Sequence, residues 1–188
     1  MATASDDFNR ADGALGSNWT TVIGGGGEVA GNLARGNSAT ESGSMWTIAT
    51  TDFADNHEVQ VTKVSDTFMN FGGPAVRMST GSGGNGYVYF NNGSLQKVVA
   101  GTRSTIDGGL ATFDAGDVIR IRATGTTIEC WKNGVSQGTF GDSDLATGQP
   151  GMLFYNDDSG ALDDWSATDE FGGGAANPFF TQIEAAIV

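Results

Sequence analysis

Short stretches in which apolar and polar residues alternate, separated by clusters of turn-forming residues, recur along this 188-residue chain. The clearest are His57 to Val64, Gly73 to Met78, Gly86 to Phe90, Asp117 to Ala123, Thr127 to Lys132 and Gly151 to Tyr155. Alternation with period 2 is typical of a β-strand, whose successive side chains point to opposite faces of a sheet. None of these stretches has the 3.6-residue repeat of an amphipathic helix. The sequence therefore predicts an all-β fold.

The composition supports many tight turns and excludes some classes of partner. The chain has 30 glycines and is rich in Ser, Thr, Asn and Asp. It carries 22 acidic and 9 basic residues, a formal net charge of −13. A nucleic-acid-binding protein needs a basic patch that displaces counterions from phosphate, and the sequence has no such cluster. No apolar run is long enough to span a bilayer. We expect neither nucleic acid nor membrane as a partner.

The segment from Asp117 to Lys132 predicts a β-hairpin around the turn residues Thr124-Gly125. Pairing of its two runs gives the hairpin one apolar and one polar face. The apolar face would carry Ile119, Ile121, Ile128 and Cys130, and the polar face Arg120, Arg122, Glu129 and Trp131. Cys130 is the only cysteine, so no disulfide can form within the chain, and we expect it in the core. The following Asn133-Gly134 is typical of a type I′ turn.

A different composition begins near Phe171. Residues 172–176 are Gly-Gly-Gly-Ala-Ala, a run of small residues that cannot pack a core. Apolar residues then follow at helical spacing, namely Phe179, Phe180, Ile183 and Ile187. We therefore expect a β-sandwich domain over residues 1–170, a linker over 171–177 and an apolar docking tail over 178–188.

Several runs, taken in chain order, carry a family resemblance. They are Asp6 to Gly13 with Leu15 to Trp19, Ala75 to Arg77 with Asn85 to Phe90, Asp117 to Arg122 with Ile128 to Gly134, and Gly148 to Leu153 with Leu162 to Trp165. In this order they resemble the concanavalin A-like lectin/glucanase superfamily, and within it the laminin-G-like modules of bacterial and bacteriophage proteins. The resemblance implies a two-sheet antiparallel jelly-roll sandwich whose first and last strands pair.

This implied pairing would bring Asp7 and Asp164 together. Relatives often hold a structural calcium at such a place, and hard carboxylate oxygens suit Ca²⁺. The alternative is that both aspartates only cap turns at the strand ends. Apart from this calcium we expect no cofactor.

The sequence gives no support for catalysis. The glucan hydrolases of this superfamily carry a Glu-x-Asp-x-x-Glu run, which supplies the two carboxylates that hydrolysis needs. No glutamate of this chain has an aspartate two residues later. His57 is the only histidine, and no nucleophile-elbow sequence accompanies it. We therefore predict that the domain is not an enzyme.

Two groups of residues are candidates for binding carbohydrate, because sugar sites combine an aromatic plane with polar groups that bind hydroxyls. One consists of Trp131 with Arg120, Arg122 and Glu129, and the other of Tyr87 with Tyr89. Two alternatives stay open: Arg120 and Glu129 form an ordinary cross-strand pair, and the tyrosines line either face of their strand. The other tryptophans, Trp19, Trp46 and Trp165, are predicted core residues.

The apolar tail and the opening run of bacteriophage type predict a non-catalytic decoration module of a larger assembly. Such a module would sit on a virion surface and bind other protein subunits through its tail, although the tail could instead pack on its own sandwich. The alternative is a lectin-like carbohydrate-binding module of a bacterial protein that is secreted or on the cell surface.

Overall fold

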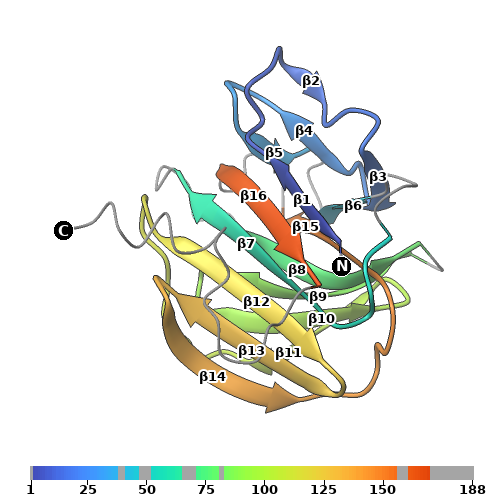
Figure 1. Ribbon diagram of the computed structural model, residues 1–188, viewed down its shortest axis with the longest axis vertical. Coiled ribbons are helices and arrows are strands. Elements are labelled where there is room, and N and C mark those ends of the chain that lie inside the picture. Colours follow the sequence, from blue (N-terminus) through green and yellow to red (C-terminus); the bar gives the residue numbers. More distant parts are fainter. Residues whose placement is uncertain are drawn as a thin grey trace.

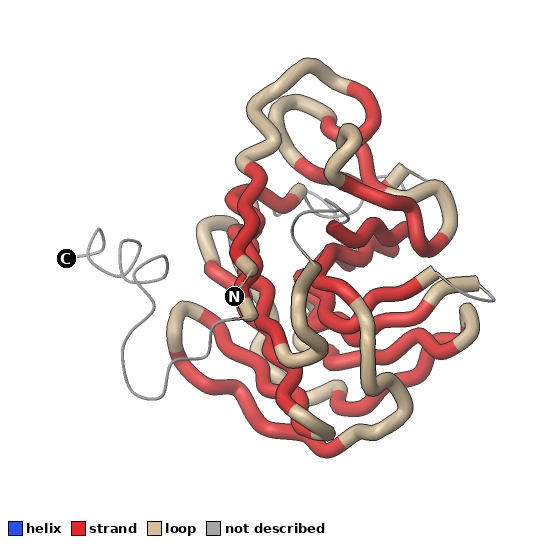
Figure 2. Tube along the Cα trace, turned by 45° about the vertical axis from the view of Figure 1, so that its right-hand side comes forward, coloured by secondary structure: helices blue, strands red, loops and turns tan. Residues whose placement is uncertain are grey.

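The computed structural model describes residues 2–37, 41–46, 52–64, 71–80, 83–155 and 161–169. All regular secondary structure in these ranges is β-strand (Figures 1 and 2), which confirms the all-β prediction. No helix long and apolar enough to cross a membrane occurs in them. The predicted docking residues Phe179, Phe180, Ile183 and Ile187 lie outside the described ranges. Docking through the tail therefore stays a prediction.

The strands form two antiparallel sheets, which confirms the predicted sandwich. The first sheet has the order β14 (Val135–Gly141), β13 (Thr127–Lys132), β12 (Val118–Thr124), β7 (His57–Lys63), β16 (Leu162–Thr168), β5 (Ala34–Gly36), β4 (Gly27–Val29) and β2 (Gly13–Ala14). The second has the order β11 (Thr102–Asp107), β10 (Ser94–Val99), β9 (Asn85–Phe90), β8 (Phe71–Ser79), β15 (Gln149–Tyr155), β6 (Glu41–Trp46) and β3 (Trp19–Ile23).

The first and last described strands are neighbours, as the resemblance implied. The strand β1 (Thr3–Asp6) pairs with β16, with Thr3 opposite Thr168 and Asp6 opposite Trp165. This pairing joins segments about 160 residues apart in the sequence. It places the turn after β1 beside the residues that begin β16.

The hairpin of β12 and β13 has the predicted faces, but its register differs from the predicted one by two residues. Thr124 pairs with Thr127, so Gly125 and Thr126 form the turn, and Glu129 is opposite Arg122 and not Arg120. Ile121 is opposite Cys130, and both are fully buried between the sheets. Arg120 is opposite Trp131 on the outer face. Asn133 and Gly134 have φ values of 49° and 76°, as a type I′ turn requires.

The core between the sheets contains the predicted tryptophans that the structure describes. Trp19 and Trp165 are 8% and 0% exposed, and their rings meet edge to face at 4.8 Å between centroids. The side chain of Trp46 lies outside the described residues.

The second sheet is also buried on its other face. Apolar side chains from β8, β9, β10 and β15 cluster there with no exposed area, namely Ala75, Val88, Phe90, Val98 and Leu153. The strand β9 is therefore apolar on both faces, which matches its unbroken apolar run from Tyr87 to Phe90.

Candidate functional site

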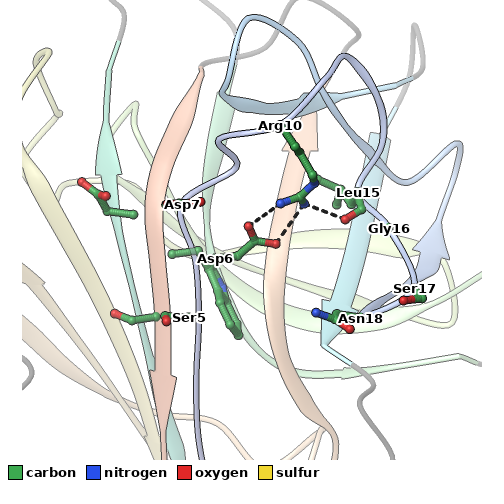
Figure 3. A pocket seen from close by; sticks show the side chains of 11 residues that line it. Ser5, Asp6, Asp7, Arg10, Leu15, Gly16, Ser17 and Asn18 are labelled. Atoms are coloured by element: carbon green, nitrogen blue, oxygen red, sulfur yellow. Dashed lines mark hydrogen bonds and ion pairs between the residues drawn. The ribbon is translucent and has the colours of Figure 1, made fainter.

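An open pocket of about 790 Å³ lies beside the paired strands β1 and β16 (Figure 3). Its wall consists of residues 5–7, 10, 15–18 and 164–166. The segment that follows β1 thus provides one part of the wall and the start of β16 another. In the view of Figure 3, Ser5 and Asp7 lie on one side of Asp6, and Ser17 and Asn18 lie on the other.

The framework of the pocket is a hydrogen-bond network around the Asp6 carboxylate. Oδ1 and Oδ2 accept hydrogen bonds from the two Nη atoms of Arg10 at 2.6 and 3.0 Å. Oδ2 also accepts the indole N–H of Trp19 at 2.7 Å, and Oδ1 the backbone N–H of Phe8 at 3.0 Å. Arg10 Nη2 donates further to the Leu15 carbonyl at 2.6 Å. A carboxylate accepts about four hydrogen bonds, so Asp6 has no capacity left for a ligand.

The turn after β1 explains how Arg10 returns to Asp6. Phe8 has a φ of 51°, in the left-handed region, and its side chain is fully buried. Its ring lies 6.1 Å from that of Trp19, and the Arg10 guanidinium lies 5.5 Å from the Phe8 centroid. Burial of Phe8 stabilises a backbone conformation that is otherwise unfavourable for a phenylalanine. The run Asp6 to Arg10 is therefore a structural turn.

Asp7 and Asp164 both line the pocket, as their predicted proximity requires. Asp7 follows Asp6 and Asp164 precedes Trp165, so in this antiparallel arrangement both lie just beyond the Asp6–Trp165 pair. Both are exposed. A hydrogen bond from the Asn9 backbone N–H lowers the pKa of Asp7 below its ordinary value. Partial burial, together with the nearby charges of Asp164 and Asp7, raises the pKa of Asp163.

A calcium ion at Asp7 and Asp164 stays a prediction. Within the described ranges, no group of three or more His, Cys, Asp or Glu residues is arranged to hold a metal ion. The two carboxylates alone would leave most of the six to eight or so oxygen ligands of Ca²⁺ to backbone carbonyls and water.

Uncharged polar groups complete the pocket wall. Ser5 and Ser166 are cross-strand partners, and the exposed Ser17 and Asn18 come from the segment before β3. In the described part of the chain, none of these four side chains has a hydrogen-bond partner. Three hydroxyls and one amide are therefore available to a ligand, together with the carboxylates of Asp7 and Asp164.

The three residues predicted to share a face with Trp131, namely Arg120, Arg122 and Glu129, do lie with it on the outer face of the first sheet. The Cζ atoms of Arg120 and Arg122 lie 4.3 and 4.9 Å from the Trp131 ring centroid. Arg122 donates two hydrogen bonds to Glu58, at 2.8 and 2.6 Å, and lies 3.8 Å from Glu129. These two guanidinium groups lie against the indole, which reduces the area of Trp131 that is open to a sugar.

The prediction that Tyr87 and Tyr89 form an exposed platform is wrong. Both side chains are fully buried between the sheets. The Tyr87 hydroxyl donates to Asp142 at 2.6 Å and accepts the Leu145 N–H, while the Tyr89 hydroxyl donates to the Ala111 carbonyl. Burial raises the pKa of Tyr87 to about 12. These tyrosines anchor loops to the core.

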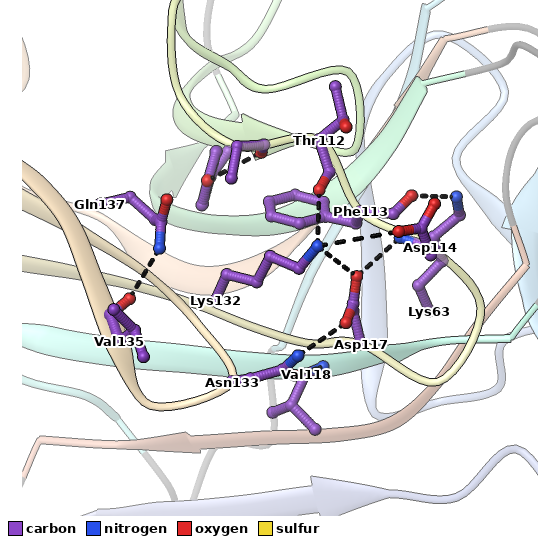
Figure 4. Close-up of polar contacts among 12 residues, drawn as sticks. Lys63, Thr112, Phe113, Asp114, Asp117, Val118, Lys132, Asn133, Val135 and Gln137 are labelled. Atoms are coloured by element: carbon purple, nitrogen blue, oxygen red, sulfur yellow. Dashed lines mark hydrogen bonds and ion pairs between the residues drawn. The ribbon is translucent and has the colours of Figure 1, made fainter.

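In a second polar cluster, around Lys132, the polar groups hydrogen-bond to one another (Figure 4). Lys132 Nζ donates to Asp117 at 2.8 Å and to the Thr112 carbonyl at 2.9 Å. Asp117 also accepts the Asn133 amide at 2.6 Å and the Asp114 backbone N–H at 2.6 Å. These contacts tie the segment between β11 and β12 to the turn after β13. The polar groups bind one another, unlike the serines of the pocket.

No protein-family model matches the sequence, and the comparison with curated proteins finds no match. Solved structures of similar shape do exist. A carbohydrate-binding module, CBM66 from Bacillus subtilis, aligns over 80% of this chain and 94% of its own at 14% identity, with a TM-score of 0.61. The fold is that of the concanavalin A-like jelly rolls. A β-1,3-1,4-glucanase from a mouse hindgut metagenome aligns over 89% and 98% of the two chains at 10% identity and a TM-score of 0.55. A β-glucanase from Bacillus licheniformis does so over 89% and 97% at 11% identity and 0.53.

The second sheet of this concanavalin A-like jelly roll lacks acidic residues in its centre. The strands β8, β9, β10 and β15 contain neither Asp nor Glu. Their side chains therefore cannot supply the pair of carboxylates, about 5–9 Å apart, that glycoside hydrolysis requires.

Of the polar side chains that line the pocket, only Asp7 and Asp164 were predicted as site residues. The others are Ser5, Asp6, Arg10, Ser17, Asn18 and Ser166. The available signal was an acidic and a basic residue four positions apart in the opening run, followed by Ser-Asn before a predicted strand. That spacing indicates an ion pair across a turn. It does not show which strand the turn will lie against.

Proposed function

We propose that this domain is a non-catalytic carbohydrate-binding module of a secreted or cell-surface protein, with its ligand in the pocket beside β1 and β16. The observation that carries the proposal is the wall of this pocket. Hydroxyl and amide groups that have no partner in the described part of the chain, together with the exposed carboxylates of Asp7 and Asp164, line an open cavity of about 790 Å³. A sugar offers hydroxyl groups at similar spacing that both donate and accept hydrogen bonds.

The Asp6 network makes the pocket suitable for binding a ligand without rearrangement. Arg10 is fixed by three hydrogen bonds, to Asp6 and to the Leu15 carbonyl, and Trp19 is fixed by one. The wall is therefore ordered before a ligand arrives, which reduces the conformational entropy lost on binding. The fold also supports the proposal, because the similar CBM66 structure is a carbohydrate-binding module.

We also propose that the domain is not catalytic. The fold alone does not decide this, because it is shared by binding modules and by glucanases. Two observations favour binding. The central strands of the second sheet carry no carboxylate, and apolar side chains bury the outer face of that sheet. In the pocket, Asp6 is saturated by hydrogen bonds and ion-paired with Arg10, so it cannot act as a general acid.

A role in decorating a virion stays a separate prediction, because it depends on the tail over residues 178–188. No similar structure that we compared supports it. Deleting residues 171–188 tests it directly: loss of incorporation into a particle would support docking through the tail, and unchanged incorporation would contradict it.

The carbohydrate proposal is tested by affinity electrophoresis of the purified protein through gels that contain soluble polysaccharides. We expect retardation by at least one polysaccharide, lost in the Ser17→Ala/Asn18→Ala double variant. Because both side chains are exposed and have no protein partner in the described part of the chain, this variant should fold normally. Trp131→Ala is the matched control for the other candidate face and should be retarded like the wild type. Retardation lost in Trp131→Ala and kept in the double variant would move the site to the outer face of the first sheet.

A further inference from the structure

The described residues of the pocket wall carry one positive charge, and the protein itself neutralises it. Among these residues, Arg10 is the only basic one. Its Nη1 donates to Asp6, and its Nη2 donates to Asp6 and to the Leu15 carbonyl. The Asp6 carboxylate holds this guanidinium in a bidentate ion pair and so offsets its attraction for an anionic ligand, although the Arg10 side chain is 35% exposed. Among the described residues, the pocket wall therefore offers no uncompensated cation to a ligand.

The negative charges of the pocket are available to a ligand. Three carboxylates and one guanidinium line it, so its formal charge is −2 (−3 from Asp6, Asp7 and Asp164, +1 from Arg10). Asp7 and Asp164 are exposed, and neither is paired with a basic side chain in the described part of the chain. The hydrogen bond from the Asn9 backbone N–H lowers the pKa of Asp7, so it favours the charged form of this carboxylate.

From this arrangement we infer that the pocket selects uncharged glycans and rejects those that carry carboxylate or sulfate groups. The inference rests on the proposed function, and it adds the class of ligand. A carboxylate can accept hydrogen bonds from two adjacent hydroxyls of a neutral sugar. Ser5, Ser17, Asn18 and Ser166 can bind further hydroxyls without any change of charge.

The pocket carboxylates would repel a sugar that itself carries a carboxylate. In the protein without bound Ca²⁺, the sugar's carboxylate would lie near Asp7 and Asp164 with no cation to compensate, and such unpaired like charges act against binding. At a separation of about 6 Å, each like charge weakens binding about threefold in water, and more in a partly shielded pocket. Two carboxylates therefore give about tenfold discrimination at low salt, and added salt should reduce it.

The inference is tested with matched pairs of polysaccharides that differ in charge. The probes are galactan against polygalacturonate, mannan against polymannuronate, and a soluble β-glucan against the same glucan oxidised to the carboxylate at C6. Binding is measured by affinity electrophoresis and by titration calorimetry in 20 mM and 300 mM salt. We expect at least one neutral polymer to bind and its acidic counterpart to bind at least tenfold more weakly at low salt.

Variants that remove single charges then show which carboxylates cause the preference for neutral over acidic polysaccharides. Asp164→Asn should raise the ratio of acidic to neutral binding about threefold, and Asp7→Asn/Asp164→Asn about tenfold. Asparagine is suitable at position 164 because it tolerates the left-handed φ of 48° found there. The matched control is Asp114→Asn, which removes one charge from the Lys132 cluster, where the Asp114 side chain is 83% exposed. This control should leave the ratio unchanged.

Each result has a definite meaning. A neutral polymer that binds in preference to its acidic counterpart, with a ratio that changes in Asp164→Asn and not in Asp114→Asn, supports the inference. Equal or tighter binding of the acidic polymer, lost in Ser17→Ala/Asn18→Ala, overturns the inference and leaves the pocket as the glycan site. Binding of neither class overturns the proposed function together with the inference.

Discussion

Asp6 and Arg10 form a bidentate ion pair, with both carboxylate oxygens of Asp6 facing the two Nη atoms of Arg10 at 2.6 and 3.0 Å. The two residues are four positions apart in a turn that is not helical. The pair joins the strand β1 to the segment that forms the other wall of the pocket. Trp19, which donates its indole N–H to the same carboxylate, extends this connection into the core.

We predict that Asp6→Ala lowers the free energy of unfolding by about 3 kcal/mol, because it leaves several donors without an acceptor in a largely buried place. The Asp6 side chain is 8% exposed. Asp7→Ala is the matched control: its side chain is exposed, and the change should cost less than about 1 kcal/mol. Denaturant unfolding of both variants measures the difference. Equal effects would show that the Asp6 network does not stabilise the fold.

We also predict loss of stability in mild acid, caused by His57. This side chain is fully buried, with Nδ1 2.8 Å from the Ala54 carbonyl and Nε2 accepting the Arg77 backbone N–H. The pKa of His57 is lowered to about 4, from 6.5 in the unfolded chain, mainly because the side chain is buried. As the pH falls, His57 is protonated in the unfolded state before it is protonated in the folded state. The contribution of neutral His57 to the free energy of unfolding is therefore fully present above pH 6.5 and is lost as the pH drops towards 4.

The expected loss from His57 is about 3 kcal/mol over this range. Carboxylates titrate in the same range, so the contribution of His57 is the difference between the wild type and His57→Gln. The free energy of unfolding of His57→Gln should be lower than that of the wild type at pH 7 and should depend less on pH between 6.5 and 4.5. Parallel profiles of the two proteins would contradict the assignment.

The two faces of the β12–β13 hairpin could be predicted from the sequence, whereas its exact register and the burial of the β9 tyrosines could not. In the hairpin, isoleucines alternate with arginines, so the period of two also distinguishes the buried face from the exposed one. Tyr87 and Tyr89 alternate with Val88 and Phe90, and both sets are buried. A strand that is apolar on both faces contains no information on which face meets the other sheet.

The pocket depends on a contact that local patterns do not encode. The pairing of β1 with β16 was implied by the family resemblance, and it correctly placed Asp7 near Asp164. Alternation along either strand could not have shown it, because the two segments lie about 160 residues apart. The turn at Phe8 was missed for another reason. A positive φ at a phenylalanine is unfavourable locally and is stabilised only by burial in the core.

A close contact between β8 and β9 predicts that Gly73→Ala is destabilising. A Cβ atom at Gly73 would lie 2.0 Å from the Tyr89 carbonyl oxygen, and backbone atoms cannot move aside easily. We expect a loss of about 3 kcal/mol or more. Gly141→Ala in β14 is the matched control, because a Cβ atom there meets nothing within 4 Å. Thermal or denaturant unfolding compares the two, and a Gly73→Ala protein as stable as the control would contradict the packing described.

The calcium prediction is tested by the melting temperature. If Ca²⁺ binds at Asp7 and Asp164, a chelator should lower the melting temperature and added CaCl₂ should restore it. At a free concentration of 100 times the dissociation constant, binding stabilises the fold by about 2.7 kcal/mol. Asp164→Asn should lose most of this response, whereas Asp114→Asn should keep it. A melting temperature that is the same with chelator and with calcium would exclude a stabilising ion.

The most direct test of the pocket as the glycan site is a ¹H–¹⁵N NMR titration with an oligosaccharide of the polymer that binds in the gel assay. Trp19 and Trp131 provide separate indole N–H signals, one bonded to Asp6 at the pocket and one on the outer face of the first sheet. We predict that the Trp19 indole signal and the amides of residues 5–18 and 164–166 shift with the sugar, while the Trp131 indole signal stays in place. Shifts centred on Trp131, with those of the pocket unchanged, would contradict the account.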